Sequence, residues 1–265
     1  MHAELIIMRH GESTWTRKEV NRFAGWVDVP LTERGRDQAR KAGGLIAGAG
    51  LSPDLVFTSL LKRSIVTADL VLDVLDRSWI PVQRTWRLNE RHYGAFQGQT
   101  RPAMLARYGQ DLFSTYRRSF DVRPPQIDTD SPYFQGADPR YAPEMDDGLG
   151  GPDPAAVRSE CLKDVQARLE PYWRSRLIPA LAEGRTVLVV THGSVVRSLV
   201  KGLEGISDQD IRSINVPTGI PLVYDCTWQA GSFSTAGPGR YLDPEAARKG
   251  MEEVASLGRP GSAGV

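Results

Sequence analysis

The sequence predicts an α/β protein with three layers, in which a doubly wound, mainly parallel sheet has helices on both faces. Two observations support this prediction. Short apolar runs rich in β-branched residues alternate along the chain with stretches of helical periodicity. These runs also lack apolar–polar alternation, as is typical of parallel strands covered on both faces. We expect strands at residues 4–8, 55–59, 80–86, 186–190 and 221–225, and helices at 34–48, 60–76, 158–181 and 194–203.

Helix start signals and one irregular segment complete the expected organisation. Thr32 precedes the first helix in the position of an N-cap, and Asp243 followed by Pro244 predicts a further short helix. The run at 121–155 is rich in Pro, Gly and Asp and has no periodicity, which is typical of a lid or a surface excursion. We therefore expect one domain at 1–230, with a lid-like insertion at 121–155, and a tail at 231–265 that ends flexibly.

The composition argues against several classes of protein. A net charge of +1 disfavours nucleic-acid binding through a global basic field, and no apolar run approaches the roughly 20 residues that cross a bilayer. The first residues show no signal-peptide pattern. The two cysteines, Cys161 and Cys226, lack metal-site spacing and fit a reducing compartment. We expect a cytoplasmic protein that binds neither nucleic acid nor membranes.

Three of the expected strands end in cationic or nucleophilic residues. Arg9 and His10 follow the first strand, Arg63 lies in the first turn of the helix after the second, and His192 follows the strand at 186–190. Open α/β sheets bind ligands at the carboxyl ends of their strands, and helix N-termini there attract anions. A single arginine or histidine of this kind is more often an ordinary surface or structural residue. Three strand ends that agree predict a phosphate-handling site, provided that the strands are neighbours and the two imidazoles meet.

A series of short motifs carries a resemblance to a known family. In chain order they are RHGES at 9–13, FAGW at 23–26, LTERG at 31–35, TSLLKRSI at 58–65, LNERHYGAFQG at 88–98, RR at 117–118, DPRYA at 138–142 and NVPTGIPLVYD at 215–225. Over roughly residues 4–230 the chain resembles the histidine phosphatase superfamily and, within it, the 2,3-bisphosphoglycerate-dependent phosphoglycerate mutases. RHG alone is typical of the whole superfamily, whereas LNERHYGAFQG and NVPTGIPLVY are specific to the mutase branch.

The resemblance implies covalent catalysis. His10 would be the nucleophile that becomes phosphohistidine, which splits phosphoryl transfer into two easier steps. Arg9 and Arg63 would keep its imidazole neutral and, with His192, would stabilise the charge on the transferring group. Glu90 would be the general acid and base for the substrate hydroxyl. From the residues alone, simple pairing of Glu90 with the neighbouring arginine is an equal alternative.

The resemblance also implies a second anionic pocket, because a mutase must hold both ends of a three-carbon acid. Bidentate arginines suit a phosphate or a carboxylate, although adjacent arginines usually form a solvated face. The substrate contacts carried over from the family are Ser13, Thr16, Ala24, Gly25, Arg63, Tyr93, Arg101, Arg117, Arg118, Gly193 and Ser194. The implied cofactor is 2,3-bisphosphoglycerate as the priming phosphoryl donor. No carboxylate cluster suggests a metal site, and the family implies a homo-oligomer, a dimer or a tetramer.

Several positions depart from the family pattern. Thr16 and Ser194 stand where members carry asparagines that help to hold phosphate, Ala24 replaces a threonine, Arg101 replaces a lysine, and RSE at 158–160 replaces LTE. A lost neutral hydrogen bond is worth about 0.5–1.5 kcal/mol. The changes therefore weaken ligand positioning without removing the nucleophile, the arginines or the acid. They lead to the hypothesis of a diverged paralogue.

The resulting prediction is a mutase that interconverts 3-phosphoglycerate and 2-phosphoglycerate in glycolysis and gluconeogenesis. The alternative is a histidine phosphatase acting on a small phosphorylated metabolite, with water as the acceptor. The changed asparagine positions favour the alternative, and the second arginine cluster favours the mutase. A non-catalytic sensor is disfavoured by the intact catalytic set. We also expect residues 121–155 and the tail to close over the ligand, because excluding water protects phosphohistidine.

Overall fold

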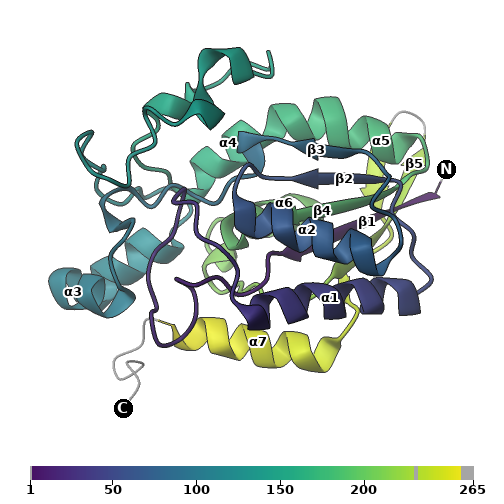
Figure 1. The fold of residues 1–265 in the computed structure, drawn as a ribbon, viewed down its shortest axis with the longest axis horizontal. Helices are drawn as coiled ribbons and strands as arrows, with labels where there is room; N and C mark the ends of the chain where they lie inside the picture. Colours follow the sequence, from purple (N-terminus) through teal and green to yellow (C-terminus); the bar gives the residue numbers. More distant parts are fainter. Residues whose placement is uncertain (1, 230–231, 258–265) are drawn as a thin grey trace.

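The structure, a computed structural model that describes residues 2–229 and 232–257, is built on one seven-stranded sheet (Figure 1). The strand order is β3-β2-β4-β1-β5-β6, and β7 pairs with β5. The pairs β3–β2, β2–β4 and β4–β1 are parallel, and the pairs that involve β5 are antiparallel. The bounds are β1 His2–Arg9, β2 Leu55–Thr58, β3 Val82–Arg84, β4 Thr186–Thr191, β5 Leu222–Gln229, β6 Ser232–Thr235 and β7 Arg240–Tyr241.

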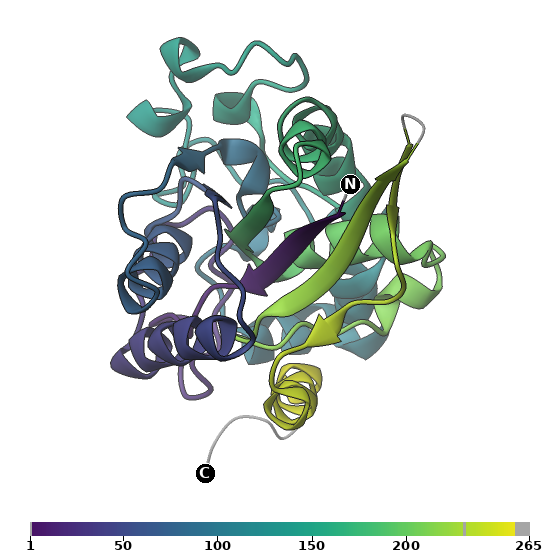
Figure 2. The ribbon, with the colours of Figure 1, turned by 90° about the vertical axis from the view of Figure 1, so that its right-hand side faces the viewer.

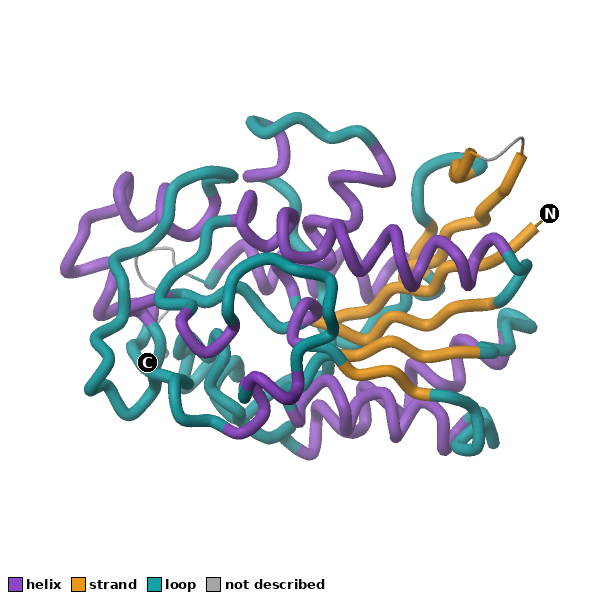
Figure 3. The backbone as a smooth tube through the Cα atoms, turned by 90° about the horizontal axis from the view of Figure 1, so that it is seen from above, coloured by secondary structure: helices purple, strands orange, loops and turns teal. Residues whose placement is uncertain are grey.

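Helices cover both faces of the sheet, as Figures 2 and 3 show. In β1, Leu5 and Ile7 pack into one apolar cluster with α4, α5 and α6, whereas Ile6 and Met8 pack into another with α1 and α2. Successive strand residues point to opposite faces, so an unbroken apolar run feeds two cores at once. The predicted three-layer α/β fold is confirmed. The helices are α1 Glu33–Gly48, α2 Lys62–Val74, α3 Arg101–Arg118, α4 Leu162–Tyr172, α5 Ile178–Ala182, α6 Gly193–Glu204 and α7 Pro244–Ser256.

Two expected helices behave differently from one another. The helix expected at 34–48 begins where Thr32 predicts, because the Thr32 hydroxyl accepts a 3.0 Å hydrogen bond from the Gly35 N–H. The single helix expected at 158–181 was wrong in its details. Helix α4 begins only at Leu162, and a π-helical turn at Trp173–Leu177 separates it from α5. Pro179 has no N–H for the carbonyl four residues earlier, which favours such an irregular turn.

Helix α3 is absent from the expected elements. It contains a break at Gly109, whose backbone has φ 72° and ψ 165°. Its buried Met104 and Phe113 pack with Phe23 and Phe96 from loops rather than against the sheet. The cap at Thr100, which accepts a hydrogen bond from Ala103, with proline in the first turn was the available sequence signal.

The end of the chain contributes more to the sheet than a tail was expected to. Strands β6 and β7 both pair with β5, which extends well beyond the expected 221–225. Helix α7 starts as Asp243 predicts, since its carboxylate accepts a hydrogen bond from the Ala246 N–H at 2.9 Å. The flexible end expected at 258–265 lies outside the described residues.

Residues 121–155 contain three one-turn helices and connecting loops. Ion pairs tie the segment to the body of the protein, from Asp147 to Arg87 at 2.7 Å and from Arg140 to Asp28 at 2.7 Å. Across the described residues, no helix combines the length and apolar character needed to span a membrane.

Candidate active site

The register of the two central strands brings the two sequence-predicted histidines together. Arg9 of β1 pairs with Thr191 of β4, so the next residue of each chain segment leaves the sheet at the same edge. The ring centroids of His10 and His192 are 4.9 Å apart. From the start of α2, Arg63 Nε approaches His10 Nε2 at 3.3 Å. Three strand ends therefore meet in space.

Hydrogen bonding and burial prepare His10 as a neutral base. Its Nδ1 lies 2.6 Å from the Gly11 carbonyl oxygen, which can only accept, so Nδ1 carries the proton and Nε2 keeps its lone pair. The pKa of His10 lies well below its ordinary value because of burial, reinforced by the charges of Arg63 and Arg9. An imidazole in this state can attack an electrophilic phosphorus through Nε2.

His192 is fully buried. Its Nε2 is 2.8 Å from Ser59 Oγ, and Nδ1 has no protein partner within the described residues. Burial, followed by the charge of Arg63, lowers its pKa well below the ordinary value. When Ser59 donates to Nε2, Nδ1 carries the proton and can donate to an anion beside His10.

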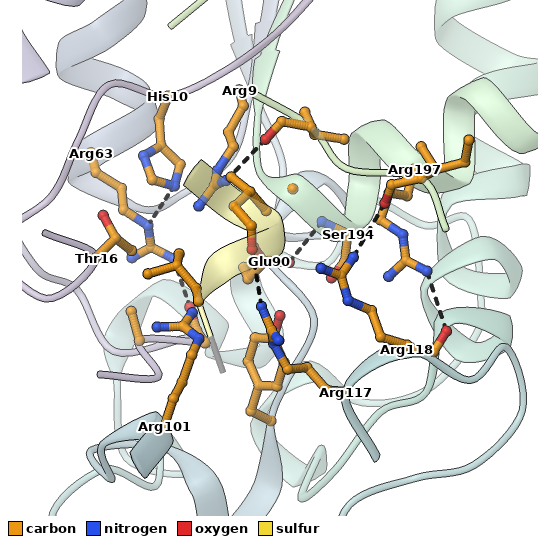
Figure 4. Close-up of a pocket in the computed structure, with 18 residues that line it drawn as sticks. Arg9, His10, Thr16, Arg63, Glu90, Arg101, Arg117, Arg118, Ser194 and Arg197 are labelled. Atoms are coloured by element: carbon orange, nitrogen blue, oxygen red, sulfur yellow. Dashed lines mark hydrogen bonds between the residues drawn. The ribbon is translucent and has the colours of Figure 1, made fainter. Parts of the chain in front are cut away.

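A cavity opens in front of His10 (Figure 4). Of the sequence-predicted site residues, it is lined by Arg9, His10, Thr16, Ala24, Gly25, Arg63, Glu90, Tyr93, Arg101, Arg117, Arg118, Gly193 and Ser194. Ser13 and His192 are fully buried and do not line it. Ser13 instead bonds to Thr16 at 3.0 Å between the two side-chain oxygens, which holds the loop after β1.

Glu90 is fixed by backbone donors rather than by its neighbouring arginine. Its Oε1 accepts hydrogen bonds from the Arg91 N–H at 2.8 Å and the Ser194 N–H at 3.1 Å. The Arg91 guanidinium turns away and donates to the carbonyl oxygens of Tyr116 and Arg117. The alternative of a Glu90–Arg91 ion pair is therefore not what the structure contains, and the Glu90 carboxylate faces the cavity.

The far side of the cavity is a cluster of arginines. Arg101 donates to Asn21 Oδ1 at 2.9 Å and Arg118 donates to Asn215 Oδ1 at 2.7 Å, while Arg117 donates to the Val254 carbonyl oxygen. The buried ion pairs of the protein lie elsewhere, and within the described residues no carboxylate pairs with these three arginines.

Burying these arginines close together lowers their pKa values. Burial, together with the charges of Arg9 and Arg118, lowers the pKa of Arg101 to about 10. Burial, together with neighbouring arginines, likewise lowers the pKa of Arg117 and Arg118. An anion that enters the cavity would relieve this repulsion.

Two of the departures from the family pattern have hydroxyls that are engaged within the protein. Thr16 Oγ1 accepts a 2.9 Å hydrogen bond from the Ser13 N–H. Burial and the charge of Glu90 act to raise the pKa of Tyr93, but the charges of Arg91 and Arg101 and a hydrogen bond with Ser194 outweigh them and lower it. Both hydroxyls therefore already have protein partners.

The structure adds lining residues that the sequence analysis missed, namely Arg197, Ile214, Val216, Val254 and Leu257. Arg197 follows Ser194 by three residues on α6, so helical spacing puts both on one face, and this signal could have found it. Val254 and Leu257 come from the end of α7. No residue of 121–155 lines the cavity, so of the two segments expected to close over the ligand only the C-terminal one reaches it.

Comparisons with known proteins show the family of the chain. The Histidine phosphatase superfamily (branch 1) matches residues 5–135 and 132–233. The chain is 54% identical over 255 residues to the 2,3-bisphosphoglycerate-dependent phosphoglycerate mutase of Clavibacter sepedonicus, covering 96% of each chain. It is 50% identical to the protein of the same name from Arthrobacter sp. (strain FB24), covering 98% of this chain and 100% of the relative.

Solved structures with lower sequence identity share the fold. The native mycobacterial glucosyl-3-phosphoglycerate phosphatase superposes with a TM-score of 0.65 at 20% identity, covering 90% of this chain and 99% of that one. Bacillus stearothermophilus YhfR superposes with a TM-score of 0.63 at 25% identity, covering 89% and 96%. The chain belongs to the histidine phosphatase superfamily and, within it, to the family of the 2,3-bisphosphoglycerate-dependent phosphoglycerate mutases.

Proposed function

We propose that this protein interconverts 3-phosphoglycerate and 2-phosphoglycerate, in glycolysis and gluconeogenesis, through a phosphohistidine at His10. The observation that carries the proposal is the continuity of the cavity from His10 to an arginine cluster without carboxylate partners. A substrate with an acidic group at each end fits such a cavity. A phosphatase needs to hold only the reacting phosphate, whereas a mutase must hold both ends of the substrate in two orientations.

The proposed chemistry starts at His10. Nε2 attacks phosphorus, and the bond from phosphorus to the substrate oxygen breaks as the bond to nitrogen forms. The Glu90 carboxylate takes the proton of the substrate hydroxyl that accepts the phosphoryl group from His10, and it gives that proton back to the departing oxygen when Nε2 attacks the other phosphate. Arg9, Arg63 and His192 stabilise the charge on the transferring oxygens, and loss of one such donor typically costs about 10²–10³ in rate.

The remaining lining residues are proposed substrate contacts. Backbone N–H groups of Gly193 and Ser194 at the start of α6, with Thr16, Ala24 and Gly25, would surround the reacting phosphate. Ser13 would act through Thr16, since it lies behind the cavity wall. The distal acidic group would contact Tyr93, Arg101, Arg117 and Arg118.

The cavity fits 2,3-bisphosphoglycerate as the cofactor. When bound, this compound supplies the phosphoryl group that charges His10. Arg9 and Arg101 each have a buried Nε without a partner in the described part of the chain, and bidentate guanidinium groups suit phosphate. We further propose chemistry without a metal ion, since the arginines supply the positive charge that the transition state needs.

We propose a cytoplasmic homo-oligomer, a dimer or a tetramer. Strand β3 is the edge of the sheet, and Trp79, three residues before it, is 74% exposed. Unpaired edges and large exposed aromatic side chains are typical of surfaces that pair with another chain.

The second candidate is a histidine phosphatase with the same His10 intermediate. It is favoured by Thr16 and Ser194, whose hydroxyls have protein partners and so offer the phosphate fewer free donors than two amides would. Poorer retention of a bound intermediate would let water compete as the phosphoryl acceptor. This candidate is also the form that a diverged paralogue would take.

One assay separates the two candidates. The protein is incubated with 3-phosphoglycerate in EDTA, with and without catalytic 2,3-bisphosphoglycerate, and 2-phosphoglycerate and free phosphate are measured in the same tube. Bisphosphate-stimulated 2-phosphoglycerate with little phosphate is the expected result. Free phosphate without isomerisation would instead establish the phosphatase, and activity that needs added metal would contradict the metal-independent chemistry.

A further inference from the structure

Arg197 is a cavity-lining cation to which neither the sequence analysis nor the catalytic scheme gives a role. It lies on α6, one helical turn beyond Ser194, and is only 6% exposed. Figure 4 shows its guanidinium beside that of Arg118, on the side of the cavity away from His10. Arg197 is therefore in a position to meet the distal end of a ligand.

One terminal nitrogen of Arg197 is already hydrogen-bonded within the protein. Nη2 donates to the carbonyl oxygen of Ile211 at 2.7 Å and to that of Arg118 at 3.3 Å. These bonds join α6 to the end of α3 and to the segment that supplies Ile214 and Val216 to the cavity.

The Nε atom of Arg197 makes no such hydrogen bond. It is buried and has no hydrogen-bond partner among the residues that the structure describes. A buried donor on a charged group is costly to leave unpaired, and guanidinium groups bind carboxylate and phosphate through Nε together with a terminal nitrogen. The orphaned atom thus points to an acidic ligand group.

The charges around Arg197 favour the same kind of ligand. Within the described residues no carboxylate forms an ion pair with it, and burial, with the charges of Arg118 and Arg91, lowers its pKa to about 9. A bound anion would compensate both the desolvation and the repulsion between the arginines.

We propose that Arg197 binds the distal acidic group of the substrate through Nε and so helps to select ligands with two acidic ends. This inference rests on the proposed assignment of the cavity to a phosphorylated acid. Lysine at this position would keep the positive charge and could still reach a carbonyl oxygen, but it would lose the planar group that presents Nε.

The test compares two ligands on three proteins by titration calorimetry. The ligands are 3-phosphoglycerate and methyl phosphate, which has no distal acid. The proteins are the wild type, Arg197→Lys and Arg87→Lys. Arg87 is a matched control because it is fully buried, is paired with Asp147 and does not line the cavity.

Arg197→Lys should weaken 3-phosphoglycerate binding by about 10- to 100-fold, the range of a lost charge-assisted hydrogen bond, and change methyl phosphate binding by less than about threefold. Arg87→Lys should lower the melting temperature without this selective loss. Equal losses for both ligands, or an equal selective loss in Arg87→Lys, would overturn the role of Arg197. If the wild type itself does not prefer 3-phosphoglycerate, the proposed function of the cavity fails instead.

Discussion

The two ends of the cavity are built from different kinds of structural element. Around His10, the functional residues follow β1 and β4 or begin α2, so the central sheet fixes them. Around Arg117, they come from α3, which is broken at Gly109 and packs on loops, and from the ends of other segments. The residues proposed for catalysis thus lie at the edge of the sheet, and those proposed for substrate selection lie on the less regular elements beyond it.

The sheet edge could be predicted from the sequence, whereas helix α3 and the arginine cluster could not. Continuous apolar runs and the His-Gly turns predicted the sheet and the meeting of His10 with His192, because parallel strand ends share an edge. Helix α3 was not predicted, and Gly109 in the middle of its sequence is a residue that disfavours helix interiors. Arg101, Arg117 and Arg118 were therefore suggested only by family resemblance. Arg197 was missed because only His192, Gly193 and Ser194 of its motif were given a role, although its helical spacing from Ser194 was visible.

The largest expected effect is loss of the nucleophile. His10→Gln removes the only atom proposed to bond to phosphorus, so both mutase and phosphatase rates should fall by about 10⁴-fold or more. Acid-labile, base-stable labelling of the protein by radioactive 2,3-bisphosphoglycerate should disappear. The exposed His2→Gln is the control and should retain labelling. Persistent labelling of His10→Gln would mean that another residue is the nucleophile.

Arg63→Gln should produce the next largest effect. Its guanidinium contacts His10 and is held by the carbonyl oxygens of Gly25 and Val27, so the change removes charge at the reacting group. We expect kcat to fall by about 10²–10³ for isomerisation and for hydrolysis alike, with KM much less affected. The exposed neighbour Lys62→Gln is the control. A loss confined to KM would move Arg63 from catalysis to binding.

A smaller effect is expected from the C-terminal segment. Val254 and Leu257 line the distal side, and Arg117 donates to the Val254 carbonyl. Removing the residues after Tyr241 should raise phosphate release relative to isomerisation by about tenfold, the size of one or two lost contacts, because water would reach phosphohistidine. Val254→Ser should act in the same direction, and the exposed Glu252→Ser should not. An unchanged ratio would separate this segment from closure.

The smallest expected effect is on the pH dependence of stability, and it comes from buried histidines. Burial lowers the pKa of His10 and His192 well below the ordinary value, and it lowers the pKa of His92 to about 4. Between each lowered pKa and about 6.5, the unfolded chain binds more protons than the folded one, so stability rises with pH.

Urea unfolding should therefore show a lower free energy of unfolding at pH 5.5 than at pH 7.5, with each histidine contributing up to about 1.4 kcal/mol per pH unit. Arg101 and Arg197, with pKa values lowered only to about 10 and about 9, stay charged across this range and should contribute nothing to the slope. His10→Gln removes one titrating group and should flatten the dependence, whereas His2→Gln should leave it as in the wild type. A slope that His10→Gln does not change would mean that His10 is equally easy to protonate in both states, and that its neutral form does not come from the sheet edge.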